Sequence, residues 1–220
     1  DLLGLLMAAS ENVQEEDHPL SPEEIRNEMI TFLFAGFEST YLSLCWTLFE
    51  MSKNPSARQK LFKEVEEVLS GRAVTYEDIA KLSFTRRVIN EALRLHPPLW
   101  AVSRVATADD EVGGYRVAKG CMVMVVPWLT HRLADQWPNP EAFEPERFLE
   151  VESNKRHKFS YLPFLVGQHK CIAEHLSLFQ LTAIIATISQ RFQLDLEGGF
   201  EPRADAQVGL NFKDGLRMVA

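Results

Sequence analysis

The stretch Phe164-Leu-Val-Gly-Gln-His-Lys-Cys-Ile-Ala173 decides how this chain is interpreted. It forms an apolar loop that brings one cysteine, Cys171, to an apolar segment that predicts a helix from Cys171 to about Arg191. A helix N-terminus favours negative charge, so it favours a thiolate, which can ligate a metal ion. Phe164 and Gly167 suit a tight loop that lies flat against a large planar cofactor. Taken alone, the stretch fits equally well a structural loop that ends at a core cysteine.

Three further motifs precede this cysteine loop. Residues 35–40 read Ala-Gly-Phe-Glu-Ser-Thr in the middle of a long apolar segment, and residues 91–98 read Glu-Ala-Leu-Arg-Leu-His-Pro-Pro. Residues 145–148 read Pro-Glu-Arg-Phe. The motifs and the cysteine loop occur in the order found in haem-thiolate monooxygenases. The chain therefore resembles the C-terminal half of the cytochrome P-450 family over essentially its whole length.

The resemblance implies a fold and a cofactor. The fold would be mainly α with small β-sheets, as in the C-terminal part of the cytochrome P-450 fold: a long central helix, a Glu-x-x-Arg helix, a meander, the cysteine loop and a following helix. Residues 1–220 would form the haem-binding half of one larger domain, and the N-terminal half would be absent from this sequence. The cofactor would be haem b with Cys171 as its thiolate ligand.

Composition and charge narrow the functional classes. The chain has 220 residues, of which 46% are hydrophobic and 25% charged, as in ordinary globular proteins. A formal net charge of −8 disfavours nucleic acid as a partner. The three cysteines, Cys45, Cys121 and Cys171, are odd in number and far apart, which argues against a disulfide framework. Cys45 and Cys121 lie in apolar runs and are predicted to be core residues.

Local patterns predict the order of the elements. Asn54 is predicted to cap the second long helix, and Ser70-Gly71 to end it. The segment 137–150 is punctuated by prolines and is expected to be irregular. The predicted helices cover residues 22–53, 55–69, 83–95 and 171–191, with a short helix after Thr75 and an earlier helix tail and polar loop in 1–20; short strands are predicted within 102–126 and near 193–196, 208–212 and 216–219.

The helix predicted over 22–53 is long and apolar enough to span a bilayer. However, Ser21-Pro-Glu-Glu24 is a capping box, and Glu38 would be costly in lipid. We therefore expect no membrane span, and a location in the cytoplasm or at the cytoplasmic face of a membrane. A helix that is apolar on nearly every side needs more protein around it than this chain provides, which predicts that the sequence is a piece of a larger body.

Glu91 and Arg94 lie three residues apart, which places their side chains on one face of a helix. As a surface pair they would contribute little to stability. The resemblance adds Arg147 and implies a Glu-Arg-Arg triad that ties this helix to the segment before the cysteine loop. A guanidinium supplies the planar, two-pronged geometry that lysine lacks. The expected role is structural, because the triad would position the loop that carries Cys171.

Ala35 and Gly36 are small residues within a bulky helix, which fits either close helix packing or, by the resemblance, a groove above the haem that admits dioxygen. Glu38 with Ser39 or Thr40 would then form an acid–alcohol pair that delivers protons. Hydroxyls that bond the carbonyl four residues earlier bend a helix and can hold water. The family usually has threonine where this chain has Ser39. Serine keeps the hydroxyl but loses the methyl that restricts its rotamer.

The resemblance also assigns haem contacts around the cysteine loop. His169 occupies the place of the family's usual propionate-binding arginine, and histidine is a weaker, pH-dependent donor. Ala173 replaces a glycine and adds a methyl group where the helix would approach the porphyrin. Arg104 matches the family's second propionate-binding arginine, with an ordinary strand-surface charge as the alternative. The pair His131-Arg132 fits the family pattern and a solvated turn equally well.

Five bulky residues are expected to form an apolar wall beside the substrate, which suggests a hydrophobic organic molecule. Each could instead be a core residue. Electrons from NAD(P)H would arrive through a reductase or ferredoxin that docks near Cys171, where His169 and Lys170 offer positive charge. The expected wall consists of Phe32, Phe37, Leu99, Trp100 and Leu210.

Two other interpretations stay open. The chain could be a non-catalytic remnant of such an enzyme, which folds only with a missing half. His169, Cys171 and His175 could also form a small zinc site, since three nitrogen and sulfur ligands suffice for a catalytic zinc. The zinc alternative does not explain the other three motifs.

Overall fold

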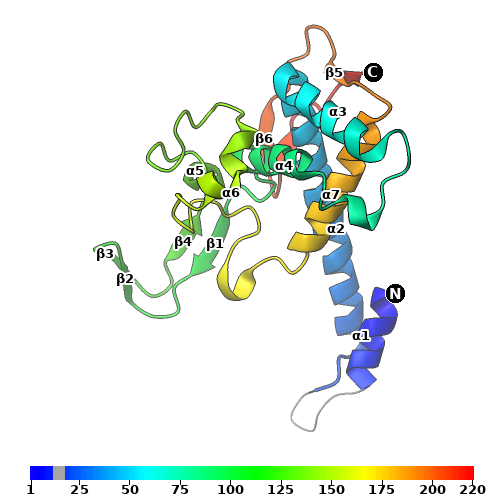
Figure 1. The fold of residues 1–220 in the computed structure, drawn as a ribbon. Coiled ribbons are helices and arrows are strands. Elements are labelled where there is room, and N and C mark those ends of the chain that lie inside the picture. Colours follow the sequence, from blue (N-terminus) through cyan, green and yellow to red (C-terminus); the bar gives the residue numbers. More distant parts are fainter. Residues whose placement is uncertain (12–17) are drawn as a thin grey trace. The chain divides into compact units, whose positions relative to one another are not determined.

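The computed structural model describes residues 1–11 and 18–220. The chain forms two compact units, Asp1–Thr40 and Tyr41–Ala220. Helices predominate among the described residues, and short antiparallel strand pairs supply the remaining regular structure (Figure 1). The predicted class, mainly α with small sheets, is confirmed.

The long helices begin and end close to where the sequence places them. The helices are α1 (Leu2–Glu11), α2 (Pro22–Lys53), α3 (Pro55–Leu69), α4 (Ser83–Leu95), α5 (Pro127–Thr130), α6 (Glu150–Ser153) and α7 (Glu174–Ser189). Short 3-10 helices are η1 (Tyr76–Asp78), η2 (Pro145–Phe148) and η3 (Gly167–His169). The strands are β1 (Val102–Val105), β2 (Asp110–Val112), β3 (Tyr115–Val117), β4 (Met122–Val125), β5 (Asp195–Leu196), β6 (Ala204–Ala206), β7 (Leu210–Phe212) and β8 (Met218–Val219).

The first unit contains α1 and α2 up to Thr40. The predicted capping box starts α2: the Ser21 N–H donates to Glu24 Oε2 at 2.8 Å, and the Glu24 N–H donates to Ser21 Oγ at 3.2 Å. The expected polar loop falls partly on residues 12–17, outside the described residues. In this unit α2 exposes large apolar side chains, among them Leu33 and Phe37.

Helix α2 has the length and composition of a membrane-crossing helix, a test that core helices of soluble proteins also pass. Its last turns bury Leu42, Trp46 and Met51 against protein in the second unit. The expectation that this chain has no membrane span stays a prediction.

The main core of the second unit lies where α4 packs against α3 and α7 (Figure 1). Apolar residues recur along α4 at the spacing of one helix face, so Val88, Ile89 and Ala92 are buried there. Helix α3 ends as predicted, with Ser70 in the left-handed conformation at φ 47° and Gly71 following at φ 80°. Segments far apart in the sequence thus hold α4 on two sides.

One helix cap and one helix start differ from the sequence prediction. Asn54 does not cap α3, because its Nδ2 donates to the Glu50 carbonyl at 2.8 Å and so satisfies the end of α2 instead. Helix α7 begins at Glu174 rather than at Cys171. The chain is still extended at Lys170, and the Cys171 N–H donates to the Phe164 carbonyl at 2.9 Å, which closes the loop before the helix starts.

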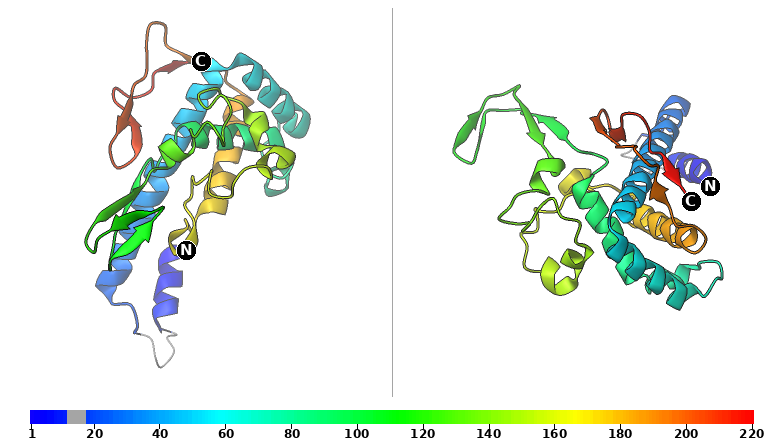
Figure 2. Two further views of the ribbon diagram at one scale, coloured as in Figure 1. Left: turned by 90° about the vertical axis from the view of Figure 1, so that its left-hand side faces the viewer. Right: turned by 90° about the horizontal axis from the view of Figure 1, so that it is seen from above.

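The strands form separate antiparallel pairs: β1–β4, β2–β3, β5–β8 and β6–β7. Gly113 and Gly114, both at positive φ, form the turn of the β2–β3 hairpin, which extends away from the helices (Figure 2). Strand β6 and the short helices α5 and α6 are absent from the sequence prediction. Cys121, predicted to be a core residue, is exposed beside β4, while Cys45 is half-buried.

A second, smaller core joins the end of α2 to the C-terminal strands. Leu42 and Trp46 pack against Leu210 and Phe212, and the Trp46 Nε1–H donates to the Leu210 carbonyl at 2.7 Å. Trp46 stacks between His96 and Phe212, with ring centroids 3.9 Å away on either side. These contacts anchor the chain's last strands to its first long helix.

Candidate functional site

The buried end of α4 carries a pair of fully buried opposite charges. Arg94 Nε donates to Glu91 Oε2 at 2.7 Å and Arg94 Nη2 donates to Glu91 Oε1 at 2.8 Å, with both side chains 0% exposed. Burial raises the pKa of Glu91, and the hydrogen bonds from Arg94 and from the Glu144 N–H oppose that rise. This two-pronged geometry is the one that arginine, unlike lysine, provides.

Arg94 also holds the backbone between His131 and Ala142. Its Nη1 donates to the carbonyls of His131 at 2.9 Å and Pro140 at 2.7 Å, and its Nη2 donates to the Ala142 carbonyl at 3.0 Å. Its guanidinium carbon lies 5.1 Å from the ring centroid of Trp137, which is itself fully buried. Every donor group of Arg94 therefore has a partner, and the carbonyls of residues 131–142 attach this segment to α4.

Arg147 completes the predicted trio in space. It lies in η2, and its Nε is 3.4 Å from Glu91 Oε1. Its Nη2 also lies 2.9 Å from Glu144 Oε2 and donates to the Asn139 carbonyl at 2.9 Å. The structure thus brings Glu91, Arg94 and Arg147 together.

His131 belongs to the same network, and the sequence left its role undecided. The solvated turn considered for it is wrong, because His131 is fully buried. The Leu162 N–H donates to His131 Nε2 at 2.7 Å, so the proton lies on Nδ1, which donates to the Arg94 carbonyl at 3.1 Å. Burial lowers the pKa of His131 to about 3, so the ring is neutral at pH 7. His131 links α4 to the start of the cysteine loop.

The cysteine loop runs from Phe164, which packs against the main core, to the exposed Cys171. Leu165 and Gly167 both have positive φ, at 57° and 75°, so the backbone turns sharply twice. A Cβ placed on Gly167 would meet no atom within 4 Å, which shows open space beside the loop. The loop therefore presents an accessible thiol next to an uncovered backbone.

The neighbours of Cys171 are mostly exposed as well. His169 lies at the surface, while Lys170 Nζ forms an ion pair with Glu174 Oε2 at 2.6 Å. Ala173 is half-buried at the start of α7. Arg104, on β1, is exposed and donates to the Ser103 carbonyl at 2.8 Å. The roles expected for His169, Ala173 and Arg104 stay predictions.

The predicted relay residues lie in the first unit, on α2. Ser39 Oγ donates to the Ala35 carbonyl at 2.6 Å, which is the bond to the fourth preceding residue that the sequence suggested. A Cβ placed on Gly36 would meet no atom within 4 Å. Glu38 and Thr40 are half-buried. The role of these residues beside a cofactor stays a prediction.

The expected substrate wall divides between exposed and buried residues. Phe32 and Phe37 are exposed on α2, and Leu99 is exposed after α4. Trp100 is half-buried and its Nε1–H donates to the Gln207 carbonyl at 2.9 Å. Leu210 is only 4% exposed and lies in the second core. Burial does not establish a substrate contact for Leu210, so that assignment stays a prediction.

A second, partly buried pair in this unit is absent from the sequence prediction. His96 Nε2 lies 2.7 Å from Glu50 Oε1, and Asn54 Nδ2 donates to Glu50 Oε2 at 3.1 Å. Burial lowers the pKa of His96, while Glu50 acts in the opposite direction. The signal in the sequence was Glu50, which follows the largely apolar stretch of residues 41–49 in α2. This pair ties the last turns of α2 to the residues that follow α4.

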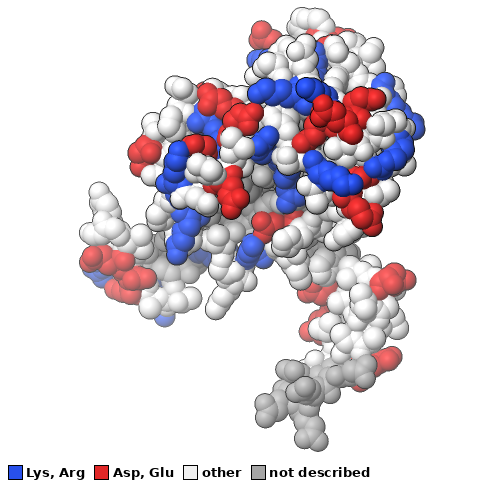
Figure 3. Space-filling view, viewed as in Figure 1, with Lys and Arg blue, Asp and Glu red and all other residues white. Residues whose placement is uncertain are grey.

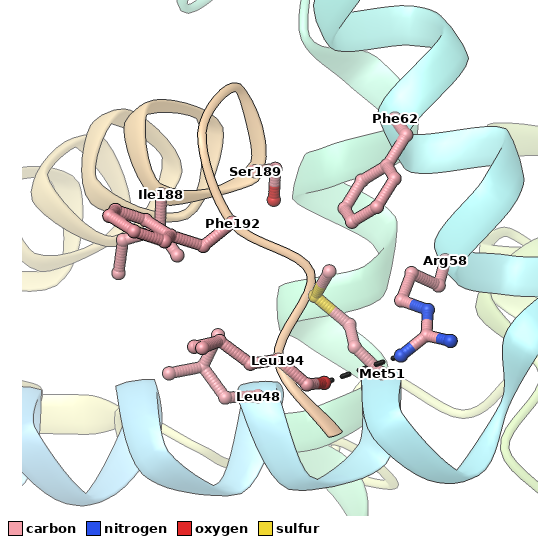
Figure 4. Close-up of a pocket in the computed structure, with 8 residues that line it drawn as sticks. All are labelled: Leu48, Met51, Arg58, Phe62, Ile188, Ser189, Phe192 and Leu194. Atoms are coloured by element: carbon pink, nitrogen blue, oxygen red, sulfur yellow. Dashed lines mark hydrogen bonds between the residues drawn. The ribbon is translucent and has the colours of Figure 1, made fainter. Parts of the chain in front are cut away.

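Among the hollows of the second unit are two whose walls do not include Cys171. A small apolar one lies between α2, α3 and the end of α7, with Met51, Phe62 and Ser189 on its walls and space for about one water molecule (Figure 4). A wider groove between α4, η2 and α7 contains Arg86 and His175 together with the exposed Tyr76. On the face shown in Figure 3, acidic and basic side chains alternate over the surface.

Comparison with known proteins decides the family. The family model described as "Cytochrome P450" matches residues 1–216. This chain belongs to the cytochrome P-450 family.

Its similarity to individual proteins extends over most or all of the chain. The chain is 36% identical over 219 residues to cyclooctatin synthase of Streptomyces melanosporofaciens, covering 100% of this chain and 47% of that protein. It is 37% identical over 194 residues to cyclooctat-9-en-7-ol 5-monooxygenase of the same organism, covering 88% of this chain and 42% of that protein. The crystal structure of the cytochrome P450DA heme domain superposes with a TM-score of 0.88 at 29% identity, covering 96% of this chain and 47% of that chain.

The chain spans about half the length of the curated relatives that it matches. Members of the cytochrome P-450 family carry haem, and the cysteine loop of this chain fits such a group. Its only titratable sulfur in residues 164–173 is exposed, and the backbone beside it at Gly167 is uncovered. A soft thiolate donor suits iron.

The zinc interpretation gains no support from the geometry. Within residues 1–11 and 18–220, no group of three His, Cys, Asp or Glu side chains is arranged to hold a metal ion. His169, Cys171 and His175 therefore do not form the ligand cluster that this alternative requires.

Proposed function

We propose that this chain is part of a haem-thiolate monooxygenase in which Cys171 is the proximal ligand. The observation that carries the proposal is the cysteine motif of a cytochrome P-450 on an exposed loop, in a chain whose Glu91, Arg94 and Arg147 also meet. The relative named as a 5-monooxygenase supports this class of reaction. When bound, a thiolate-ligated haem supplies the activation of dioxygen that lets one oxygen atom enter an organic substrate.

The protein would hold this group from several sides. Phe164 and Gly167 would form the surface of the loop against which the haem lies, with Ala173 at the start of α7. His169 and Arg104, both exposed cationic or polar side chains, would bind its propionates. The Glu91–Arg94–Arg147 cluster touches neither the cofactor nor the substrate in this proposal. Its role is to fix the segment that precedes the cysteine loop.

Proton supply would come from α2. Ala35 and Gly36 would leave room for dioxygen, because neither has a large side chain. Glu38 and the hydroxyls of Ser39 and Thr40 would hold and move protons. The bond from Ser39 Oγ to the Ala35 carbonyl supports this role, since such a bond places the hydroxyl against the helix backbone where water can join it.

The substrate would be a hydrophobic organic molecule. Phe32, Phe37 and Leu99 are large apolar side chains that the structure leaves exposed, and Trp100 and Leu210 would extend the same wall. Electrons from NAD(P)H would reach the site through a reductase or ferredoxin that docks near Cys171. A location in the cytoplasm or at the cytoplasmic face of a membrane would suit both partners.

A spectroscopic experiment tests the proposal. The haem-loaded full chain is reduced and exposed to carbon monoxide, and we expect the strongly red-shifted Soret band of a thiolate ligand. Cys171→Ser abolishes this band, whereas Cys121→Ser, at the other exposed cysteine, retains it. Failure of the parent protein to take up haem would instead favour a non-catalytic remnant. Zinc in the purified protein would favour a zinc-binding domain.

A further inference from the structure

Helix α4 lacks a cap from its own sequence. Leu82 is the residue before its first turn, has no side-chain hydrogen bond to the helix, and is fully buried. The first turn also contains no acidic residue. The N–H groups at the start of a helix have no partner within the helix, so α4 needs an acceptor from elsewhere.

Glu64, from the middle of α3, supplies that acceptor. Its Oε1 accepts from the Phe84 N–H at 2.6 Å and from Ser83 Oγ at 3.3 Å. Its Oε2 accepts from the Thr85 N–H at 2.8 Å and from Thr85 Oγ1 at 2.8 Å. One carboxylate thus binds two orphan N–H groups and two hydroxyls, and its negative charge faces the positive end of the helix dipole.

The opposite end of α4 carries the Glu91–Arg94 pair. A helix of 13 residues is short and rigid, so a displacement of its first turn moves its last turn with it. Arg94 donates to the carbonyls of His131, Pro140 and Ala142, and these bonds require the Arg94 side chain to lie at a fixed position along the axis of α4. The position of the first turn is therefore coupled to the segment that leads to Cys171.

A second contact fixes the same three elements. Glu146 in η2 lies 3.1 Å from Lys60 Nζ on α3 and 3.7 Å from Arg87 Nη2 on α4. Glu146 and Lys60 are exposed and Arg87 lies 3.7 Å away, so these pairs are weaker than the cap. Helices α3 and α4 are thus joined to each other at the cap and to η2 at Glu146.

We infer that Glu64 is a positioning residue of the proposed haem-thiolate site: it caps α4 from α3 and thereby sets the placement of the Glu91–Arg94 pair and, through it, of the cysteine loop. The inference rests on the proposed function only in its last step. The first step, capping, concerns α3 and α4 alone.

The capping step is tested by amide hydrogen exchange. In Glu64→Ala, the amides of Phe84 and Thr85 exchange faster than in the parent protein, by roughly two- to thirty-fold, the range expected for a lost helix cap. Glu64→Gln, which keeps one acceptor oxygen, gives an intermediate increase. Glu66→Gln, at an exposed position of the same helix, gives none. Unchanged exchange in Glu64→Ala would overturn the inference.

The positioning step is tested on the reduced, carbon monoxide-treated haem protein. The ratio of the thiolate-type red-shifted Soret band to the unshifted band falls in Glu64→Ala by roughly two- to thirty-fold at a temperature where every variant is folded. Glu64→Gln keeps the inference testable if Glu64→Ala does not fold. Phe212→Leu, which loosens the second core, leaves the ratio unchanged.

The outcomes separate the two claims. A parent protein with no red-shifted band contradicts the proposed function and, with it, the positioning step. If the parent protein shows the red-shifted band and Glu64→Ala has the same ratio of shifted to unshifted band as the parent, only the positioning step is contradicted. If the band ratio fell equally in Phe212→Leu, the cause would be a general loss of stability and not the placement of α4.

Discussion

The buried end of α4 and the cysteine loop differ in how their polar groups are satisfied. Around α4, Glu91 and Arg94 are 0% exposed and bind only protein atoms. In the cysteine loop, Cys171 and His169 are exposed and an open space lies beside Gly167. The polar groups of the first region are therefore satisfied within the protein, whereas the second region exposes its thiol to solvent. Substitutions should accordingly affect folding in the first region and cofactor binding in the second.

The largest effect is expected from breaking the buried pair. Glu91→Ala leaves the Arg94 and Arg147 guanidiniums without their shared carboxylate, so the free energy of unfolding should fall by about 3–5 kcal/mol. Urea denaturation of the full chain measures this fall. Glu152→Ala, which removes an exposed pair with Lys155, should change stability little. Equal effects of the two substitutions would mean that the α4 network is not a scaffold.

The matching substitution in the second region is Cys171→Ala. Because the side chain is exposed, unfolding of the haem-free chain should change by no more than about 0.5 kcal/mol. The red-shifted band should nevertheless disappear. A large loss of stability without haem would show that Cys171 is a core residue after all.

Acid pH should weaken the scaffold through His131. Burial lowers its pKa from 6.5 to about 3, so the folded state binds fewer protons than the unfolded state in this window. Stability is fully present above pH 6.5 and should fall by about 1.4 kcal/mol per pH unit as the pH drops towards 3. The lowered pKa of His96 acts in the same direction.

Chemical denaturation at several pH values measures this slope. His131→Asn should reduce the slope, whereas His157→Asn, at an exposed histidine, should leave it as it is. The same slope in His131→Asn and in the parent would mean that another group governs the acid sensitivity.

A smaller effect is expected from Gly167→Ala. The residue has φ 75°, which costs an L side chain about 1–2 kcal/mol even though open space surrounds it. Gly198→Ala provides the control, because Gly198 has neither a positive φ nor close neighbours. Thermal unfolding should distinguish the two variants. Equal unfolding midpoints of the two variants would indicate that the loop can adopt another backbone conformation at residue 167 without a cost in stability.

The smallest effect on stability is expected from Ser39→Thr. The added methyl restricts the rotamer of the hydroxyl and should change unfolding by no more than about 0.5 kcal/mol. If Ser39 takes part in proton delivery, the loaded enzyme should release less peroxide per electron consumed than its parent. An unchanged peroxide yield would remove Ser39 from the relay.

Regular helices and local pairs were accessible to sequence reasoning. The bounds of α2, α3 and α4 follow from apolar periodicity and end signals such as Ser21 and Ser70, which act within a few residues. Glu91 and Arg94 are neighbours on one helix face for the same reason. The family resemblance added Arg147, which no local rule connects to them.

What the sequence did not show depends on contacts between distant segments. The burial of His131 and the cap from Glu64 are set by packing between elements, and neither leaves a periodic signal. The start of α7 was placed at Cys171 because apolar residues continue from there, but the loop-closing bond to Phe164 delays the helix until Glu174. Cys121 lies in an apolar run, yet the β1–β4 pair leaves it exposed.

The bond between Trp46 and Leu210 has a consequence for biosynthesis. The two residues are 164 positions apart, so at roughly 5–20 residues per second the indole waits roughly 8 to 33 seconds for its acceptor to be translated. The α3–α4 cap spans only 21 positions and can form long before. A ribosome-bound chain could therefore already hold a capped α4 while Trp46 of α2 still lacks its acceptor. During that interval the exposed Trp46 would be available to a chaperone.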